Sequence, residues 1–214
     1  MVMAQPFTTA SPLIASFDWT DIQSGTGTDT FLLYQTETSA GTDHHLSPNT
    51  VYSSALSEQI GPVDGALAKA SDIDYDLTEY QISQEIEGVG HLEIPIAYEI
   101  TNAAGTGSFY MIAKLRKWDG TTETEVASVQ SETISSTAGV TDETVWSMPI
   151  TIPYTHFAQG DTLRLTIETW ATSDGTEEIY LAYGIDPINR EVIFHTETMQ
   201  TSISKLSVPF KLNL

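Results

Sequence analysis

The chain has 214 residues, of which 40% are hydrophobic and 17% are charged, and it contains no cysteine. Without cysteine it can form neither a disulfide framework nor a thiolate metal site, and it has no Cys nucleophile. The 29 acidic residues outnumber the 8 Lys and Arg, which gives a formal net charge of −21. A surplus of this size repels the phosphates of nucleic acids and anionic membrane surfaces, so we expect neither as a partner.

This charge imbalance predicts a saline environment. Like charges held in a compact fold repel each other. Salt shortens the range of that repulsion from roughly 30 Å in dilute buffer to about 3 Å at 1 M. An ordinary acidic protein of a dilute medium is the alternative that the composition leaves open.

The predicted elements begin with an extended arm over residues 1–24, which Pro6 and Pro12 interrupt. No basic residue precedes its apolar patch, so the arm does not resemble a secretory signal peptide. No apolar run in the chain approaches the roughly 20 residues that a membrane helix needs. Residues 25–214 are predicted to form a single domain, in which 205–214 is a terminal strand or a clamp.

After the arm, apolar and polar residues alternate in the way typical of half-buried strands. The alternation is clearest over residues 91–101, 108–118 and 162–172. Further strands are predicted over 28–36, 73–82, 121–129, 145–154, 179–185 and 206–214. Strands divided by Gly, Asp and Asn turns predict an all-β fold, an antiparallel β-sandwich that is jelly-roll-like and carries the extended N-terminal arm.

Four local signals refine this pattern. Asp119-Gly120 predicts a tight hairpin between two of the strands. Proline cannot donate to a ladder, so Pro149 and Pro153 predict an edge strand, and Pro95 predicts an edge or a bulge. Residues 39–49 are predicted to form a polar loop, and 56–70 is the stretch that could hold a helical turn.

Two clusters are candidate metal sites. Asp72, Asp74 and Asp76 alternate and would line one face of a strand, but the Gly and the twelfth-position Glu of a calcium loop are missing. His44 and His45 could reach one ion only in a bent loop, because neighbouring residues of a strand point to opposite faces. Solvated side chains are the alternative at both places. Weak Ca²⁺, Mg²⁺ or Na⁺ binding is therefore the most we expect, with no other cofactor.

The few basic residues are candidate contacts with an acidic neighbour in an assembly. Lys114, Arg116 and Lys117 lie in one predicted strand, and Lys205 and Lys211 lie in the C-terminal run. Salt bridges within the chain's own acidic body are the alternative. Apolar residues near both ends of the chain would clamp a partner, namely Phe7, Phe17, Trp19, Val208 and Phe210.

No catalytic motif is present, so an enzyme is not expected. The chain has no G-x-S-x-G sequence and no phosphate loop, and paired carboxylates carry no weight in so acidic a chain without geometry. Trp118, Trp146 and Trp170 could form a platform on which a sugar stacks, provided that they share a face. Packing in the core or in an interface is the alternative for these rings.

Residues 17–37, 46–54, 113–133 and 160–190 together resemble structural proteins from the virions of tailed viruses. Because the chain is so acidic, we expect such a virus to infect halophilic archaea. The resemblance implies a sandwich or jelly-roll protein on the outer capsid surface, because packaged DNA would repel it from the interior. It carries over no enzymatic residues.

The function implied is a virion structural protein that decorates or cements the capsid or forms a turret on it. It would act as a homo-oligomer, a trimer before a pentamer, in contact with the major capsid protein or another virion protein. A carbohydrate-binding or adhesive sandwich, built on the tryptophans, is the alternative. A calcium-dependent accessory domain of an enzyme is a third interpretation.

Overall fold

The structure, a computed structural model, describes residues 25–100, 106–137, 141–174, 178–195 and 197–211. Over this part of the chain it is all-β, as predicted, and no helix there could cross a membrane. The strands are β1 (Thr26–Thr38), β2 (Gly41–Ser47), β3 (Ser57–Val63), β4 (Ala68–Asp76), β5 (Gln84–Ile100), β6 (Thr106–Trp118), β7 (Glu123–Gln130), β8 (Ile134–Thr137), β9 (Thr141–Phe157), β10 (Thr162–Ser173), β11 (Ile179–Gly184), β12 (Ile193–Phe194), β13 (Glu197–Thr198) and β14 (Lys205–Lys211).

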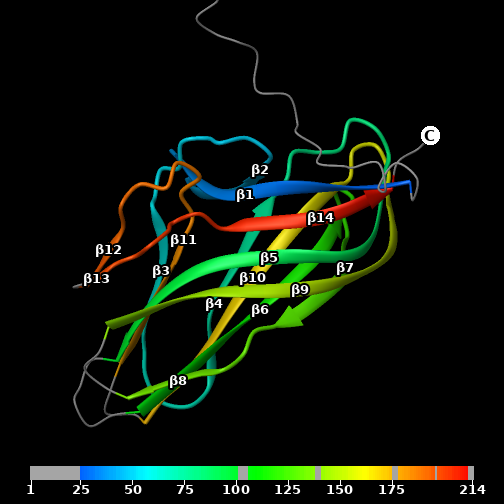
Figure 1. The fold of residues 1–214 in the computed structure, drawn as a ribbon. Coiled ribbons are helices and arrows are strands. Elements are labelled where there is room, and N and C mark those ends of the chain that lie inside the picture. Colours follow the sequence, from blue (N-terminus) through cyan, green and yellow to red (C-terminus); the bar gives the residue numbers. More distant parts are fainter. Residues whose placement is uncertain (1–24, 101–105, 138–140, 175–177, 196, 212–214) are drawn as a thin grey trace, which may run out of the picture.

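Hydrogen bonds join most of these strands into one sheet that folds over on itself to make two layers (Figure 1). In the first layer β9 runs along one side of β5, while β14 and then β11 take the other side. β1 and β2 extend this layer beyond β14, and β3 extends it beyond β11. The second layer has the order β4, β10, β6, with both β7 and β8 paired to β6.

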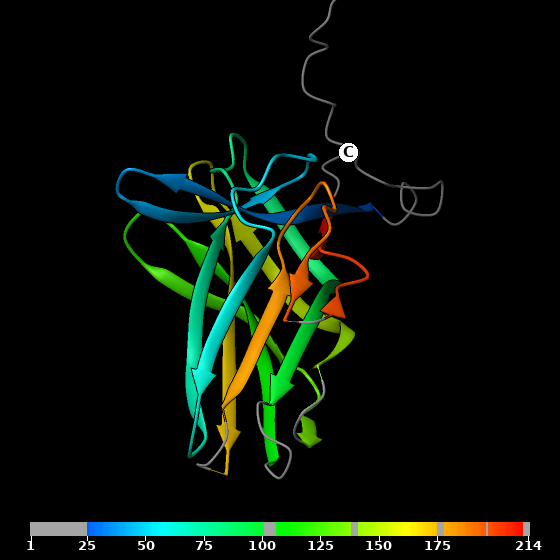
Figure 2. The same cartoon turned by 90° about the vertical axis from the view of Figure 1, so that its left-hand side faces the viewer.

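The two layers are joined in the sheet by β2. All ladders are antiparallel except the bridge between His45 of β2 and Asp76 of β4, which is parallel. Figure 2 shows β1 and β2, in blue, crossing one end of the layers. The predicted antiparallel β-sandwich therefore describes the packing, although the sheet as a whole is mixed.

The core lies between the layers because alternate residues of the central strands point inward. Ile94 and Ile96 of β5 are fully buried, as are Leu165 and Ile167 of β10. These are the alternating apolar positions that the sequence predicts for the two strands. Their burial explains why the register is well defined, since a shift of one residue would turn each set of side chains outward.

A tyrosine pair crosses this core. The hydroxyls of Tyr75 in β4 and Tyr183 in β11 lie 3.0 Å apart, and both side chains are completely buried. Burial raises the pKa of Tyr75 well above its ordinary value of 10, and it raises the pKa of Tyr183 in the same direction. Both therefore stay neutral, and each satisfies the other's polar group while linking the two layers.

Prolines occur in both an edge strand and a central strand. β9 contains Pro149 and Pro153 and pairs with β5 alone among the described strands, so the predicted edge is confirmed for this part of the chain. Pro95 is not at an edge, because β5 has neighbours on both sides. It lies where those neighbours change, since the β14 ladder reaches Glu93 and the β11 ladder begins at Ile96. A residue with no amide hydrogen is tolerated at such a break in the pairing.

The outer face of β5 and β11 is covered by residues 186–204, which include the β12–β13 hairpin. A second apolar cluster forms beneath this segment from Ala97, Ala182, Val192, Phe194 and Met199. The close approach depends on Gly184, where a Cβ atom would lie 2.5 Å from the Ser202 backbone. The segment therefore adds a small core outside the main one.

Two predictions of local structure need correction. Residues 39–49 contain strand β2, and the stretch 56–70, proposed to hold a helical turn, contains β3 and the start of β4. Gly61 and Gly65 both have positive φ there, at 119° and 78°, which suits turns and bulges and not a helix. The Asp119-Gly120 hairpin is confirmed between β6 and β7. The predicted arm over residues 1–24 lies outside the described residues.

Replacing Leu165 with Ala tests the core. Leu165 is fully buried and faces Tyr75 on one side and Leu115 on the other in the ladders of β10. We expect the free energy of unfolding to fall by about 2–5 kcal/mol, because the change removes buried methyl groups and leaves a cavity. Leu67→Ala is the matched control, since Leu67 is 52% exposed and should change stability by less than about 0.5 kcal/mol. Urea unfolding in a fixed salt concentration measures both, and equal losses would contradict the placement of Leu165.

Candidate functional site

A network of ion pairs covers the outer face of the second layer, which we call the charged face. It contains Lys69, Asp72, Asp74, Asp76, Lys114, Arg116, Glu123, Arg164 and Glu168. Adjacent strands bring these residues together because alternate positions of β4, β6 and β10 share one face.

Arg164 is the centre of one half of the charged face. Its guanidinium binds Asp76 through two nitrogens, at 2.6 and 2.8 Å, in the bidentate geometry that favours strong pairing. It also contacts Glu123 at 2.9 Å and Asp74 at 3.2 Å. The ring of Trp118 lies 5.4 Å from the guanidinium carbon. One arginine thus holds carboxylates from β4 and β7 together.

Glu168 is the centre of the other half. It is 5% exposed and accepts a hydrogen bond from the ammonium of Lys114 at 2.7 Å, while Lys69 lies at 3.6 Å. The indole N–H of Trp170 donates a further bond at 3.1 Å. Burial alone would raise the pKa of Glu168, but the hydrogen bonds from Lys114 and Trp170 and the nearby positive charges outweigh it and hold the pKa below 4.5.

These pairs occupy the carboxylates proposed to bind metal. Asp72 pairs with Lys69, while Asp74 and Asp76 pair with Arg164. Across the described ranges no group of three or more His, Asp or Glu is arranged to hold a metal ion. The prediction of a cation site on this strand therefore gains no support from the geometry.

The two predicted histidine ligands point to different neighbours. His44 lies 3.2 Å from the carboxylate of Glu58, and His45 lies 2.9 Å from the hydroxyl of Thr36. They sit on strand β2 and not in a bent loop, so they face opposite sides of it.

All eight Lys and Arg side chains of the chain are in ion pairs with the chain's own acidic groups. Among the predicted partner contacts, Lys117 pairs with Asp161, Lys205 with Glu93 and Lys211 with Glu87. The intramolecular alternative accounts for every basic residue in that set, including Lys114 and Arg116.

Of the predicted apolar clamps, the structure describes only the two near the C-terminus. Val208 is 2% exposed and packs in the main core, and Phe210 is half-buried against the same core. The C-terminal run is therefore a strand within the sheet, β14, which pairs with both β1 and β5. Phe7, Phe17 and Trp19 lie outside the described residues.

The tryptophans do not form a common platform. Trp146 packs in the core, with its ring 5.5 Å from that of Phe109. Trp170 stacks beside Tyr110 on the charged face, at 6.3 Å and 6° between ring planes. Because Trp146 faces inward and Trp170 outward, these rings cannot stack together on one sugar.

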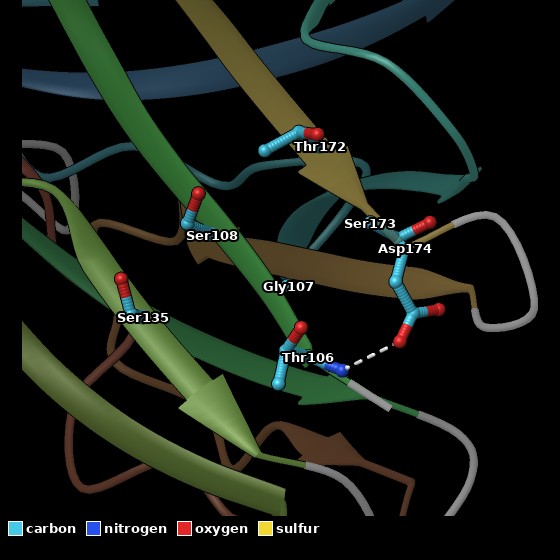
Figure 3. A pocket seen from close by; sticks show the side chains of 7 residues that line it. All are labelled: Thr106, Gly107, Ser108, Ser135, Thr172, Ser173 and Asp174. Carbon is cyan, nitrogen blue, oxygen red and sulfur yellow. Dashed lines mark hydrogen bonds between the residues drawn. The ribbon is translucent and has the colours of Figure 1, made fainter. Parts of the chain in front are cut away.

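A hydroxyl-rich pocket of about 320 Å³ lies where β6, β8 and β10 reach the end of the sandwich (Figure 3). Its lining is Thr106, Gly107, Ser108, Ser135, Thr172, Ser173 and Asp174. The carboxylate of Asp174 accepts a hydrogen bond from the Thr106 amide at 3.2 Å. The Gly65 turn braces the β10 wall, since its carbonyl accepts from the Thr172 hydroxyl at 2.9 Å. This lining can hydrogen-bond a polar ligand but contains no histidine or lysine to act as a base.

A serine–histidine pair lies on the outer face of the first layer. Nε2 of His91 in β5 is 2.5 Å from the hydroxyl of Ser147 in β9. The pair forms because His91 faces Pro149 in the ladder between β5 and β9. Ser147 is two residues before Pro149, so its side chain lies on the same face as that of His91. Sequence analysis missed it, since 56 residues separate the two and neither lies in a recognisable motif. In the part of the chain that the structure describes, no carboxylate completes a Ser-His-acid chain.

An aspartate–arginine turn anchors the segment that covers the first layer. Asp186 is completely buried, and Arg190 donates to it from its side chain at 2.9 and 3.0 Å and from its backbone amide at 2.7 Å. Burial would raise the pKa of Asp186, but these hydrogen bonds outweigh it and hold the pKa below 3.8. Arg190 also donates to the Ser53 carbonyl at 2.6 Å, which ties two loops together.

Comparison with known proteins finds a similar fold in solved structures of two hydrolytic enzymes. No protein-family model and no curated protein sequence matches the chain. Among solved structures, an α-amino acid ester hydrolase matches with a TM-score of 0.52 and 9% identity over 86% of this chain. An aminopeptidase from a marine sediment archaeon, Thaumarchaeota archaeon, matches with a TM-score of 0.50 and 6% identity over 86% of the chain. The chain spans only 36% and 37% of those two proteins, so the likeness is to an all-β part of each.

These findings correct the expected function. The resemblance to virion structural proteins is wrong as an assignment, because the matching folds belong to hydrolases. The expected capsid role, its carbohydrate-binding alternative and the expectation that the chain has no enzymatic role are corrected with it. The capsid partner, the oligomer and the virion location depend on that resemblance and stay untested predictions.

Glu168→Gln tests the charged face. We expect the free energy of unfolding at neutral pH to fall by about 1.5–3 kcal/mol, as for other hydrogen bonds to charged groups. Because the pKa of Glu168 is lower in the folded state, its ionised form stabilises the fold above about pH 4.5 and that stabilisation disappears as the pH falls further. The variant should therefore lose part of the acid dependence of stability. Glu79→Gln, on an exposed residue, is the control, and urea unfolding at several pH values measures both. A variant as stable and as acid-sensitive as the native protein would contradict the assignment.

Salt should stabilise the fold. The ion pairs use all eight bases, so the surplus of 21 negative charges has no base left to pair with. Raising NaCl from about 0.05 M to 1 M screens that repulsion. It weakens exposed ion pairs as well, but each of those contributes only about 0–1 kcal/mol. We expect the free energy of unfolding in urea, which is uncharged, to rise with NaCl. A constant or falling value would show that the acidic surplus does not strain the fold.

Proposed function

We propose that this chain is the all-β part of a hydrolase that acts on ester or peptide bonds. The observation that carries the proposal is the match of 86% of the chain to a part of an α-amino acid ester hydrolase. The aminopeptidase match points to the same broad chemistry, the cleavage of a bond at a carbonyl carbon. Neither match brings residues of a catalytic centre to this chain, so the candidates must come from its own side chains.

The Ser147–His91 pair is the candidate within the described residues. A serine hydroxyl is a weak nucleophile until an adjacent base takes its proton, and Nε2 of a neutral histidine can do so. The two groups are in direct hydrogen-bond contact at 2.5 Å, so a proton could pass from the hydroxyl to the ring nitrogen without an intervening water. Ser147 also borders a groove beside β9, where a substrate could approach the hydroxyl.

The proposed reaction has two steps. Oγ of Ser147 bonds to the carbonyl carbon while its proton passes to Nε2 of His91. The carbon–oxygen bond of an ester, or the carbon–nitrogen bond of an amide, then breaks as the leaving group takes that proton. Water next attacks the acyl carbon while His91 accepts one of its protons. The bond between that carbon and Oγ of Ser147 breaks, His91 returns the proton to Oγ, and the acid is released.

Hydrolysis by the full chain in high salt tests this function. The substrates are α-amino acid methyl esters and amino-acid p-nitroanilides, followed by titration of the acid and by absorbance. We expect turnover above the buffer rate, and a loss of at least about 100-fold in Ser147→Ala and in His91→Gln, the usual scale for removing a general base. Ser207→Ala is the matched control, because Ser207 faces His91 from β14 without bonding to it in the described structure. No turnover, or turnover that the Ser147 and His91 variants retain, would contradict the proposal.

A further inference from the structure

A groove of about 470 Å³ runs between β9 and the end of β7, on the side of the sandwich away from β5. Residues 144–149 of β9 form one wall, and residues 129–132 together with Ile134 form the other. Its size is within the range of pockets that hold small ligands or short peptide segments. The Ser147 hydroxyl lies at its rim, but the indole, the strand edges and the charge of the groove have no part in the proposed hydrolysis.

The floor of the groove contains an unpaired hydrogen-bond donor. Trp146 lines the groove and is only 8% exposed, with Met148, 4% exposed, on the same strand. Within the described residues the indole N–H of Trp146 donates no hydrogen bond, whereas that of Trp170 donates to Glu168. Because this N–H has no acceptor within the described part of the protein and is not among its buried polar atoms, it is free to donate to an occupant that brings an acceptor.

Two open strand edges flank the same groove. Among the described strands β9 pairs with β5 alone and β7 with β6 alone, so each has one row of backbone amides and carbonyls that no described strand pairs with. Proline at 149 and 153 limits the part of β9 that can accept a new strand to the stretch before Pro149. An exposed edge of this kind is where an extended peptide can add to a sheet through main-chain hydrogen bonds.

The charge around the groove indicates which kind of peptide could bind there. Its lining includes Glu132 but no Lys or Arg, and all eight bases of the chain are engaged in ion pairs elsewhere. With a net charge of −21, the protein repels an acidic segment and attracts a basic one.

From these features we propose that the groove binds an extended peptide with apolar side chains and a net positive charge, which adds as a strand to the free edge of β9 over residues 144–148. One apolar side chain packs on Trp146 and Met148, and an acceptor of the peptide takes the indole N–H. The proposal is independent of hydrolysis, since it needs neither His91 nor the Ser147 hydroxyl.

Nuclear magnetic resonance of the indole N–H groups tests it on the full chain. The probe is a synthetic peptide of six residues, with leucine and threonine alternating between two terminal lysines and both ends blocked. The four tryptophans give separate indole signals, and Trp146→Phe identifies one of them by its loss. We expect the Trp146 signal to shift with peptide concentration and the amides of residues 144–148 to become protected from exchange. The Trp170 signal, on the charged face, should not move.

Two altered peptides separate strand addition from adventitious binding. A peptide methylated on alternate amide nitrogens cannot pair along one edge, so we expect it to lose the shift and the protection. A peptide with glutamate in place of lysine should bind more weakly, and the difference should shrink in 1 M NaCl because salt screens the repulsion. Unchanged binding of the methylated peptide, or a Trp146 signal that does not move, would overturn the proposal. Trp170→Phe is the matched control, because it removes an indole without touching the groove.

Discussion

The pairing of eight basic side chains with a large excess of carboxylates is the interaction on which the outer surface of this protein depends. In the second layer the bases lie on one face of β4, β6 and β10. Lys69 and Arg164 each contact carboxylates from two strands, while Lys114 and Arg116 each pair with one carboxylate on a neighbouring strand. Arg164 is the clearest case, because one guanidinium neutralises acids contributed by β4 and β7. Without these bridges, like charges would face each other across adjacent strands, where direct opposition is destabilising. Although the bases are few, each of them is already paired with an acidic group of the same chain.

The first layer depends on a different device, the length of β5. This strand is long enough to take β9 along one side and two successive partners along the other. Just beyond the change of partner, Ala97 of β5 packs against apolar side chains of the covering segment, residues 186–204. The covering segment is itself anchored by the buried Asp186–Arg190 interaction, whose arginine reaches the Ser53 carbonyl. The pairing of buried Asp186 with the partly exposed Arg190 thus supports the packing of a segment that contains no long strand.

These two surfaces have different chemistry. On the charged face, the lysine and arginine side chains are already paired with the carboxylates beside them. The side of the sandwich near β9 has, within the described residues, a strand edge without a partner and an indole N–H without an acceptor, and it also carries the hydrogen-bonded Ser147–His91 pair. Unpaired polar groups are where new bonds can form with least competition. That contrast directs attention to β9 for both the proposed hydrolysis and the proposed peptide binding, and the likeness to hydrolases is consistent with either role in an enzyme.

The sequence by itself determined the strand class and the core. The alternating residues of 91–101, 108–118 and 162–172 became β5, β6 and β10, because a strand turns every second side chain to the same face. It also identified the β6–β7 hairpin and the edge position of β9. It misread residues 39–49 as a loop, since a short strand with one buried end looks polar in isolation. Only the tertiary structure decided which residues meet. His91 and Ser147, Arg164 and Asp76, and Glu168 and Lys114 are far apart in the chain, and strand pairing brings them within bonding distance. Spacing along a sequence carries no record of register between distant strands, so the function of these side chains was not readable from it.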